Sequence, residues 1–176
     1  MIDPVYRGFL ARQHEQALAL NAASDLVEIR PVAGELPPSR YVVEFRCQGL
    51  VRVAGQVREA SSFDVGVWFP SDYLRRAEPF EVLTWLGPAE VFHPNISDRA
   101  PLICIGRLIR GTPLADIVYR VFDIITGHNV TMVEHDALNR AACAWARENR
   151  HRFPIDRRPL KRRALALRAE PVTRTA

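Results

Sequence analysis

The sequence predicts a single α+β domain, and three observations support this prediction. Apolar residues near the start of the chain recur at helical spacing, a middle part alternates apolar with polar residues as strands do, and two further helical patterns follow a long irregular segment. The length of 176 residues fits one domain, while 48% hydrophobic and 25% charged residues are typical of a folded globule. We therefore expect one α+β core.

The first predicted element is a helix over residues 4–22. Asp3 can accept a hydrogen bond at the start of this helix, and Pro4 suits its first turn. One face carries the apolar residues Tyr6, Phe9, Leu10, Ala17 and Leu20. The helix is therefore expected to be amphipathic, with this face buried.

An antiparallel meander of about four strands is predicted next, because the candidate strands follow one another with short turns between them. The four strands are expected at residues 41–47, 50–57, 63–69 and 80–86. In the first of them apolar residues alternate with Glu44 and Arg46, which puts Cys47 on the buried face. Residues 59–62 have the composition of a turn between the second and third strands.

A long loop is predicted at residues 87–111, which are rich in proline, asparagine and glycine. Two C-terminal helices are expected after it. The first opens at Thr112-Pro113, carries a continuous apolar stripe and ends at Gly127. The second runs over residues 136–152, and Cys143 lies among alanines there, where it is expected to pack in the core.

Charge divides the chain into a predicted domain over residues 1–153 and a basic tail over residues 154–176. The tail holds seven of the 24 basic residues and two of the 20 acidic ones, which leaves the domain with 17 basic and 18 acidic residues. We expect the tail to be flexible or to dock onto a partner. A basic tail can meet nucleic acid, an acidic protein or anionic lipid, and its charge alone does not predict nucleic-acid binding.

Composition and spacing exclude several classes of protein. No apolar run approaches the roughly 20 residues of a membrane-spanning helix, and the first residues lack the basic flank and apolar stretch of a secretion signal. The three cysteines are an odd number without C-x-x-C spacing, and no histidine or cysteine cluster has the spacing of metal ligands. We expect a cytoplasmic protein without a disulfide framework, a bound metal or a cofactor.

The predicted loop carries the residues with the most chemistry. His93-Pro94-Asn95 is followed, nine positions after the asparagine, by Cys104. A cysteine thiolate is a nucleophile, and an asparagine amide can donate a hydrogen bond to the oxyanion that forms at an acyl carbonyl. Because a loop of this length inside a compact domain is often functional, these residues predict covalent thiol chemistry at Cys104.

These motifs resemble those of the ubiquitin-conjugating enzymes, the E2 family. The matching runs are Phe69-Pro70-Ser71-Asp72-Tyr73, Val91-Phe92-His93-Pro94-Asn95-Ile96, Ile103-Cys104-Ile105, His135-Asp136-Ala137-Leu138-Asn139 and Arg147-Glu148-Asn149-Arg150-His151-Arg152-Phe153. They correspond to the family's F-P-x-D-Y, H-P-N and I-C-L motifs, to its D-D-P-L helix and to the aromatic residue that ends this helix. The resemblance covers about residues 4–153 and implies the family's UBC-like fold.

The resemblance implies a carrier enzyme. Such an enzyme takes a ubiquitin-like modifier from an E1-like activating enzyme as a thioester, here on Cys104, and passes it to an amine of a target protein, typically a lysine. Asn95 would support the oxyanion or the loop that holds the active site, and His93 would brace this loop. Asp136 would orient the incoming lysine and accept its proton, and its position also suits a cap of the last predicted helix.

The sequence departs from the family pattern around these motifs. Cys104 lies one residue further from the asparagine than in the family, and the family's final helix is replaced by the tail. The other departures are Gly106, Gly111, His135 and Ala137, which replace an acidic residue, a tryptophan, an aspartate and a proline. This divergence, with the arginine- and alanine-rich composition, resembles bacterial members found in antiviral defence operons.

Three other functions stay open from the sequence. One is a non-catalytic E2-like module that recognises a ubiquitin-like protein, although such modules lack the cysteine. Another is a Cys-His hydrolase that pairs Cys104 with His93, His128 or His135, although no hydrolase motif surrounds the cysteine. The third is nucleic-acid binding by the tail.

Lys161 is the one lysine of the sequence. This scarcity reflects either a general preference for arginine or a benefit to a thioester carrier, which would otherwise modify its own lysines.

Overall fold

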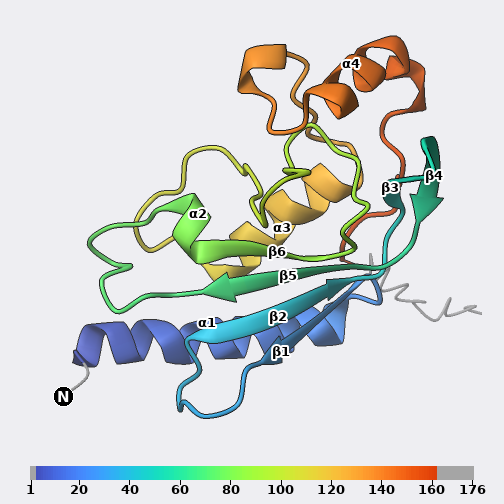
Figure 1. The fold of residues 1–176 in the computed structure, drawn as a ribbon. Helices are drawn as coiled ribbons and strands as arrows, with labels where there is room; N and C mark the ends of the chain where they lie inside the picture. Colours follow the sequence, from blue (N-terminus) through green and yellow to red (C-terminus); the bar gives the residue numbers. More distant parts are fainter. Residues whose placement is uncertain (1–2, 162–176) are drawn as a thin grey trace, which may run out of the picture.

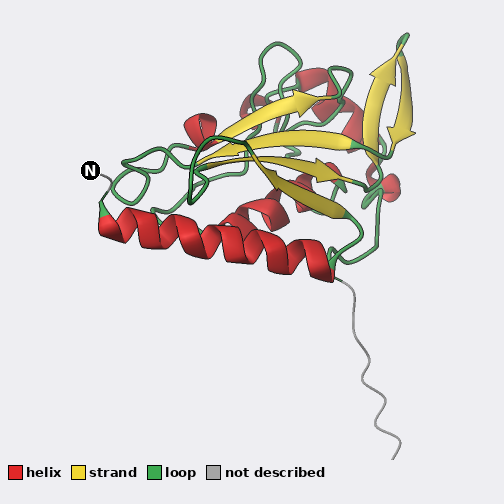
Figure 2. Ribbon diagram, turned by 90° about the horizontal axis from the view of Figure 1, so that it is seen from below, coloured by secondary structure: helices red, strands yellow, loops and turns green. Residues whose placement is uncertain are grey.

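The computed structural model describes residues 3–161 and contains one four-stranded antiparallel sheet in the order β1-β2-β5-β6 (Figure 1). Its strands are β1 (Val27–Pro31), β2 (Arg40–Phe45), β5 (Phe63–Trp68) and β6 (Leu83–Gly87). Helix α1 (Pro4–Ala23) runs along the sheet, contacts β1 and α3 (Leu114–Ile125), and shares one hydrophobic core with them (Figure 2). The predicted α+β class and a four-stranded antiparallel sheet are therefore confirmed, although β1 takes the place of the strand predicted at residues 50–57.

The remaining elements surround this core. They are the hairpin strands β3 (Gly49–Val53) and β4 (Gln56–Ala60), the short helix α2 (Pro79–Val82), the single turns η1 (Glu134–Asp136) and η2 (Arg150–Arg152), and helix α4 (Arg140–Glu148). None of the helices within residues 3–161 has the length and apolar character that crossing a membrane requires.

The predicted first helix is confirmed as α1, and the Asp3 carboxylate accepts a hydrogen bond from the amide of Val5 at 2.9 Å. All five apolar residues predicted to face inward are buried. The same face also buries Gln13, whose Oε1 accepts a hydrogen bond from the amide of Leu114 at 2.8 Å. That amide lies at the start of α3 and has no partner within its own helix, so Gln13 fixes α1 to α3.

The predicted strands at residues 41–47 and 63–69 are confirmed as β2 and β5, which pair along their whole length. Cys47, which was predicted to lie in the core, is fully buried, and burial raises the pKa of its thiol to about 12. The sheet thus forms where apolar and polar residues alternate most regularly.

Strand β1 is an addition that the sequence did not predict. It pairs with β2, where Ile29 lies opposite Val43. The side-chain amide of Asn21 on α1 donates to the Ile29 carbonyl at 2.9 Å and accepts from the Ile29 amide at 2.8 Å. Asn21 therefore satisfies backbone groups that an edge strand otherwise leaves unpaired, and Pro31 at the strand end has no N–H to expose.

The prediction of a single strand at residues 50–57 is wrong. The chain reverses at Ala54 and Gly55, whose φ angles are 49° and 80°, and β3 and β4 form a separate hairpin outside the main sheet. Two consecutive positive φ angles are the geometry of a tight two-residue hairpin turn, which glycine adopts without strain. Residues 59–60, predicted as part of a turn, belong to β4 instead.

The elements on either side of the long loop are close to their predicted positions. The predicted fourth strand at residues 80–86 is correct only in its second half, because the chain first forms α2 and enters β6 at Leu83. The helix predicted after Thr112-Pro113 is confirmed as α3. Gly127, with a φ of 77°, follows its C-terminal end as predicted.

The helix predicted over residues 136–152 starts later and ends earlier. The backbone amides of Leu138 and Asn139 donate to the carbonyl of Pro94 at 2.9 and 3.2 Å, so they are bonded outside any helix. Asn139 then caps α4, because its Oδ1 accepts a hydrogen bond from an amide of the first turn at 2.9 Å. The predicted cap role of Asp136 is therefore wrong, since this residue lies in η1.

Residues 154–161, the first part of the predicted tail, pack against the domain. The buried Asp156 carboxylate accepts hydrogen bonds from the amide of Gln48 at 2.9 Å and from the Arg158 guanidinium at 2.6 Å. Leu160 is also buried, and its carbonyl accepts a hydrogen bond from the hydroxyl of Ser24. The rest of the tail, residues 162–176, lies outside the described residues, so its predicted flexibility or partner docking stays a prediction.

The negative charge of Asp156 strengthens the hydrogen bonds that fix residues 154–161 to the domain. Burial opposes ionisation of the carboxyl, but the hydrogen bonds from Arg158 and Gln48 together outweigh burial and lower its pKa from 3.8 to about 2. A carboxylate with a lowered pKa in the folded chain stabilises the fold at every pH above its unfolded pKa. This contribution is lost as the pH falls from about 4 toward 2.

We predict that Asp156→Asn lowers the free energy of unfolding at neutral pH by about 1–3 kcal/mol, because charge-assisted hydrogen bonds are lost. Urea unfolding measured between neutral pH and about pH 2 should show the difference from the parent chain shrinking below pH 4. Arg157→Ala, which removes an exposed neighbouring charge, is the matched control and should change stability little. A difference that stays constant down to pH 2 would contradict this role of the charge.

Candidate functional site

The predicted long loop is present, because no helix or strand lies between β6 and α3. Its middle nevertheless folds back on itself. Ile96 and Ile103, both fully buried, form an antiparallel bridge, and the amide of Cys104 donates to the carbonyl of Asn95 at 2.8 Å. The spacing of nine residues therefore places Asn95 and Cys104 opposite each other across two paired stretches of chain.

Cys104 is the partly exposed member of the three cysteines. Its neighbours Ile103 and Ile105 are buried, which anchors the backbone on both sides of the thiol. Cys47 and Cys143 are buried in the domain, the latter as predicted, with its sulfur 3.5 Å from the carbonyl oxygen of Thr131. The structure thus leaves Cys104 as the thiol that a reaction partner can reach.

Asn95 is buried, and its side-chain amide holds backbone groups on two sides. Its Nδ2 donates to the carbonyl of Cys104 at 3.3 Å, and its Oδ1 accepts from the amide of Thr131 at 2.9 Å. The Asn95 side chain therefore joins the Cys104 stretch to the segment that precedes α4. The amide nitrogen also carries a second N–H.

His93 is buried beneath the same loop. Its Nδ1 accepts a hydrogen bond from the amide of Asn95 at 3.1 Å, which places the ring proton on Nε2. Burial lowers the pKa of His93 to about 3, so the ring is neutral near pH 7. Nε2 has no hydrogen-bond partner within the described residues. His93 is thus placed to brace the loop rather than to exchange protons.

Asp136 lies on the exposed turn η1, with its Oδ1 3.4 Å from Nε2 of His135. The segment that carries this turn is fixed at both ends to the His93-Pro94-Asn95 motif, through Thr131 on one side and Leu138 on the other. The fold therefore ties the segment that carries Asp136 to the His93-Pro94-Asn95 motif, while the Asp136 carboxylate itself lies against His135.

The histidines do not form a catalytic pair with the thiol in this structure. Among the described residues no histidine nitrogen is hydrogen-bonded to Cys104, and His128 instead contacts the hydroxyl of Thr126 at 2.9 Å. No group of three or more His, Cys, Asp and Glu side chains within residues 3–161 could hold a metal ion.

The sequence analysis gave no role to two residues that organise this region, Asn139 and Thr131. Asn139 caps α4, and its type at the start of an alanine-rich helix was a usable signal. The Thr131 amide donates a hydrogen bond to Asn95, and the Thr131 carbonyl accepts one from Cys143. Because both contacts use backbone groups, the type of residue at position 131 did not predict them.

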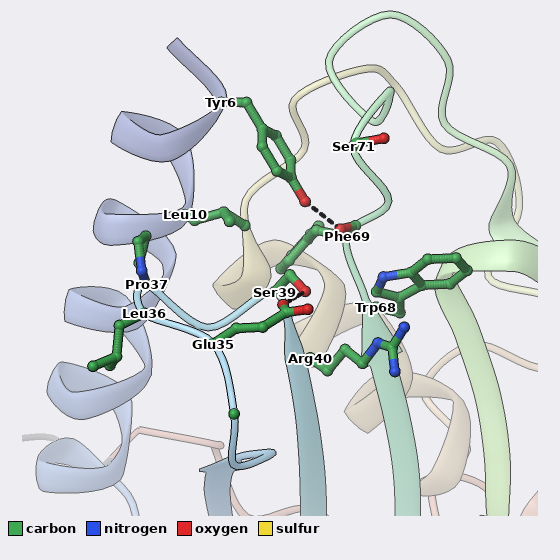
Figure 3. Close-up of a pocket in the computed structure, with 11 residues that line it drawn as sticks. Tyr6, Leu10, Glu35, Leu36, Pro37, Ser39, Arg40, Trp68, Phe69 and Ser71 are labelled. Carbon is green, nitrogen blue, oxygen red and sulfur yellow. Dashed lines mark hydrogen bonds between the residues drawn. The ribbon is translucent and has the colours of Figure 1, made fainter. Parts of the chain in front are cut away.

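A separate cavity of about 500 Å³ lies between the first half of α1, the loop after β1 and the end of β5 (Figure 3). In this cavity the guanidinium carbon of Arg40 lies 5.1 Å from the centre of the Trp68 ring. The Tyr6 hydroxyl donates a hydrogen bond to the carbonyl of Phe69. Its lining contains none of the four predicted site residues. The cavity is therefore a different surface from the Cys104 site.

Comparison with known proteins is informative only at the level of structure. No family model matches the sequence, and neither does any curated protein. A solved structure described as a novel ubiquitin-conjugating enzyme matches with a TM-score of 0.56 and 19% identity, over 84% of this chain and 88% of that chain. The E2 domain of a Toxoplasma gondii ubiquitin conjugating enzyme matches with a TM-score of 0.55 and 17% identity, over 82% of this chain and 91% of that chain.

Both structural matches extend over most of each chain, and their low identities make them a statement about fold. They agree with the UBC-like fold that the sequence motifs imply. The chain therefore has the fold of the ubiquitin-conjugating E2 domains.

Proposed function

We propose that this chain is an E2-type carrier that holds a ubiquitin-like modifier as a thioester on Cys104. The observation that supports this best is the partly exposed Cys104 thiol, held opposite Asn95 in a loop of an E2-like fold. A carrier needs a thiol that a large acyl donor can approach, and the other two cysteines are buried.

Charging would exchange one thioester for another. The Cys104 thiolate attacks the carbonyl carbon of the modifier, which is held as a thioester on an E1-like activating enzyme. An oxyanion forms, and its collapse breaks the donor's carbon–sulfur bond and releases the donor thiolate. The step needs no redox partner, because both sides hold one thioester and one thiolate.

Transfer would end on an amine of a target protein, typically a lysine. The amine nitrogen attacks the thioester carbonyl, the bond to the Cys104 sulfur breaks, and the amine loses a proton. A free lysine has a pKa near 10.4, so most lysines are protonated at pH 7. Asp136 would act by position and by accepting the proton, since a negative charge by itself favours the ammonium form.

Asn95 would serve first as a positioning residue. Both polar ends of its amide hold backbone, at Cys104 and at Thr131, and this fixes the thiol relative to the turn that carries Asp136. The remaining N–H would then donate to the oxyanion. His93, neutral and buried, would keep the Asn95 backbone in place.

A non-catalytic E2-like binding module is the second candidate, and the exposure of Cys104 favours the carrier over it.

The arginine-rich composition and the departures from the family motifs support the further proposal of a bacterial, cytoplasmic member that acts in antiviral defence. Its partners would then be an E1-like enzyme, a ubiquitin-like modifier and a target protein.

A charging assay with the activating enzyme, the modifier and ATP tests the carrier function. We predict an adduct that reductant removes, because a thioester is cleaved by thiols. Cys104→Ala should abolish the adduct, and Cys104→Ser should give a reductant-resistant ester or no adduct. Cys143→Ala is the control and should still charge, because Cys143 is a buried packing residue. An adduct that persists in Cys104→Ala would contradict the proposal.

Replacement of Asn95 separates its two roles. Asn95→Ala removes the contacts to both Cys104 and Thr131, and we predict a loss of stability of about 1–3 kcal/mol together with discharge slowed about 100-fold. Asn95→Asp keeps an acceptor for the Thr131 amide, so it should be more stable than the alanine variant yet discharge as slowly. Urea unfolding and single-turnover discharge to free lysine measure the two effects, and normal discharge in both variants would exclude Asn95 from the reaction.

Asp136→Asn should leave charging unchanged and slow discharge to free lysine by about tenfold or more, because the carboxylate acts only on the incoming amine. Glu134→Gln is the matched control on the same exposed turn, where Glu134 pairs with Arg147 at 3.5 Å. If both variants discharged at the parent rate, Asp136 would have no part in proton transfer.

A further inference from the structure

The basic residues of this chain are almost all of one kind. Of 24 lysine and arginine residues, Lys161 is the single lysine. The loop that carries Cys104 follows the same pattern, and its basic residues are Arg99, Arg107 and Arg110, all exposed. The loop that carries the candidate thiol thus holds basic side chains but no side-chain amine.

This distinction matters chemically for a protein that carries a thioester. The amine of a lysine can lose its proton and attack the thioester carbon, which forms an amide bond and releases the Cys104 thiol. A guanidinium stays protonated in proteins and offers no such nucleophile, while it still forms ion pairs and hydrogen bonds. Arginine therefore supplies the charge of lysine without its reactivity toward an acyl group.

Arg107 shows how close such a residue lies to the thiol. It follows Cys104 by three positions, a span of at most about 11 Å of extended chain. The chain bends at Gly106, whose φ is 76°, and the Arg107 carbonyl accepts a hydrogen bond from the Arg120 guanidinium at 2.8 Å. The backbone at position 107 is thus held in place, and an amine on a flexible side chain there could reach the acyl group.

Lys161 is placed differently. It follows Leu160, which is buried and bonded to Ser24 just after α1, so the described chain ends beside the C-terminal end of α1 (Figure 2). The Lys161 side-chain nitrogen lies 5.8 Å from the ring centre of Tyr119, which is a cation–π contact. The chain's one lysine therefore lies on an anchored segment, with its side chain against an aromatic ring.

We propose that arginine replaces lysine around Cys104 so that the charged thiol is protected from the chain's own amines, which leaves the modifier for amines of other proteins. This inference rests on the proposed carrier function. The lack of lysine side chains in the loop that carries Cys104 would thus determine which amines receive the modifier.

The test introduces one amine near the thiol. We expect Arg107→Lys to charge like the parent chain and then, without an added acceptor, to lose its thioester about tenfold faster than the parent. The product should resist reductant, and tandem mass spectrometry should find the modifier at position 107. Arg12→Lys, at an exposed position of α1, is the matched control and should keep the parent's thioester lifetime. Arg110→Lys provides a second position in case the first variant charges poorly.

The outcomes separate this inference from the function on which it depends. If the parent chain forms no reductant-sensitive adduct, the carrier function fails. If the parent charges but both loop variants keep its thioester lifetime and gain no reductant-resistant product, the protective role of arginine is overturned. The same conclusion follows if the parent chain modifies itself at Lys161 as fast as the loop variants modify themselves.

Discussion

The candidate site depends on a short stretch of paired backbone. Ile96 and Ile103 are fully buried and bridge each other, and this pairing sets Asn95 opposite Cys104. In an extended chain neighbouring side chains point to opposite sides. Because Ile103 and Ile105 point into the core, the side chain between them turns outward. The exposure of the sulfur therefore follows from two buried isoleucines and not from any contact of the sulfur itself.

The segment before α4 is bound to this stretch mainly through backbone groups. The Pro94 carbonyl accepts two amide hydrogen bonds from it, and the Asn95 side chain accepts one from Thr131. The buried His93 ring accepts a hydrogen bond from the Asn95 amide, and because burial lowers its pKa to about 3, it is neutral at any pH well above 3. The hydrogen bond that the His93 ring accepts from the Asn95 amide is therefore kept near neutral pH.

The elements that were predicted correctly are those whose type and ends follow from residues within the element or next to it in sequence. Asp3 marks the start of α1, and the alternation before Cys47 marks β2. The hairpin at residues 54–55 was missed because alanine gives no turn signal at a positive φ and the apolar alternation runs through the turn. The start of α4 was missed because Pro94, distant in sequence, binds the amides before it. At the site, motif side chains were recognisable, whereas Thr131 contributes only backbone.

The main sheet has two outer strands, and neither presents a free row of backbone groups at its centre. On β1 the amide of Asn21 occupies both groups of Ile29, and on β6 the Trp85 amide donates to the carbonyl of Pro101 at 3.0 Å. Partners that bind by strand addition need such groups to be open. A partner that added a strand at the centre of either outer edge of the main sheet would therefore have to displace these hydrogen bonds, and copies of this chain meet the same obstacle to joining edge to edge through that sheet.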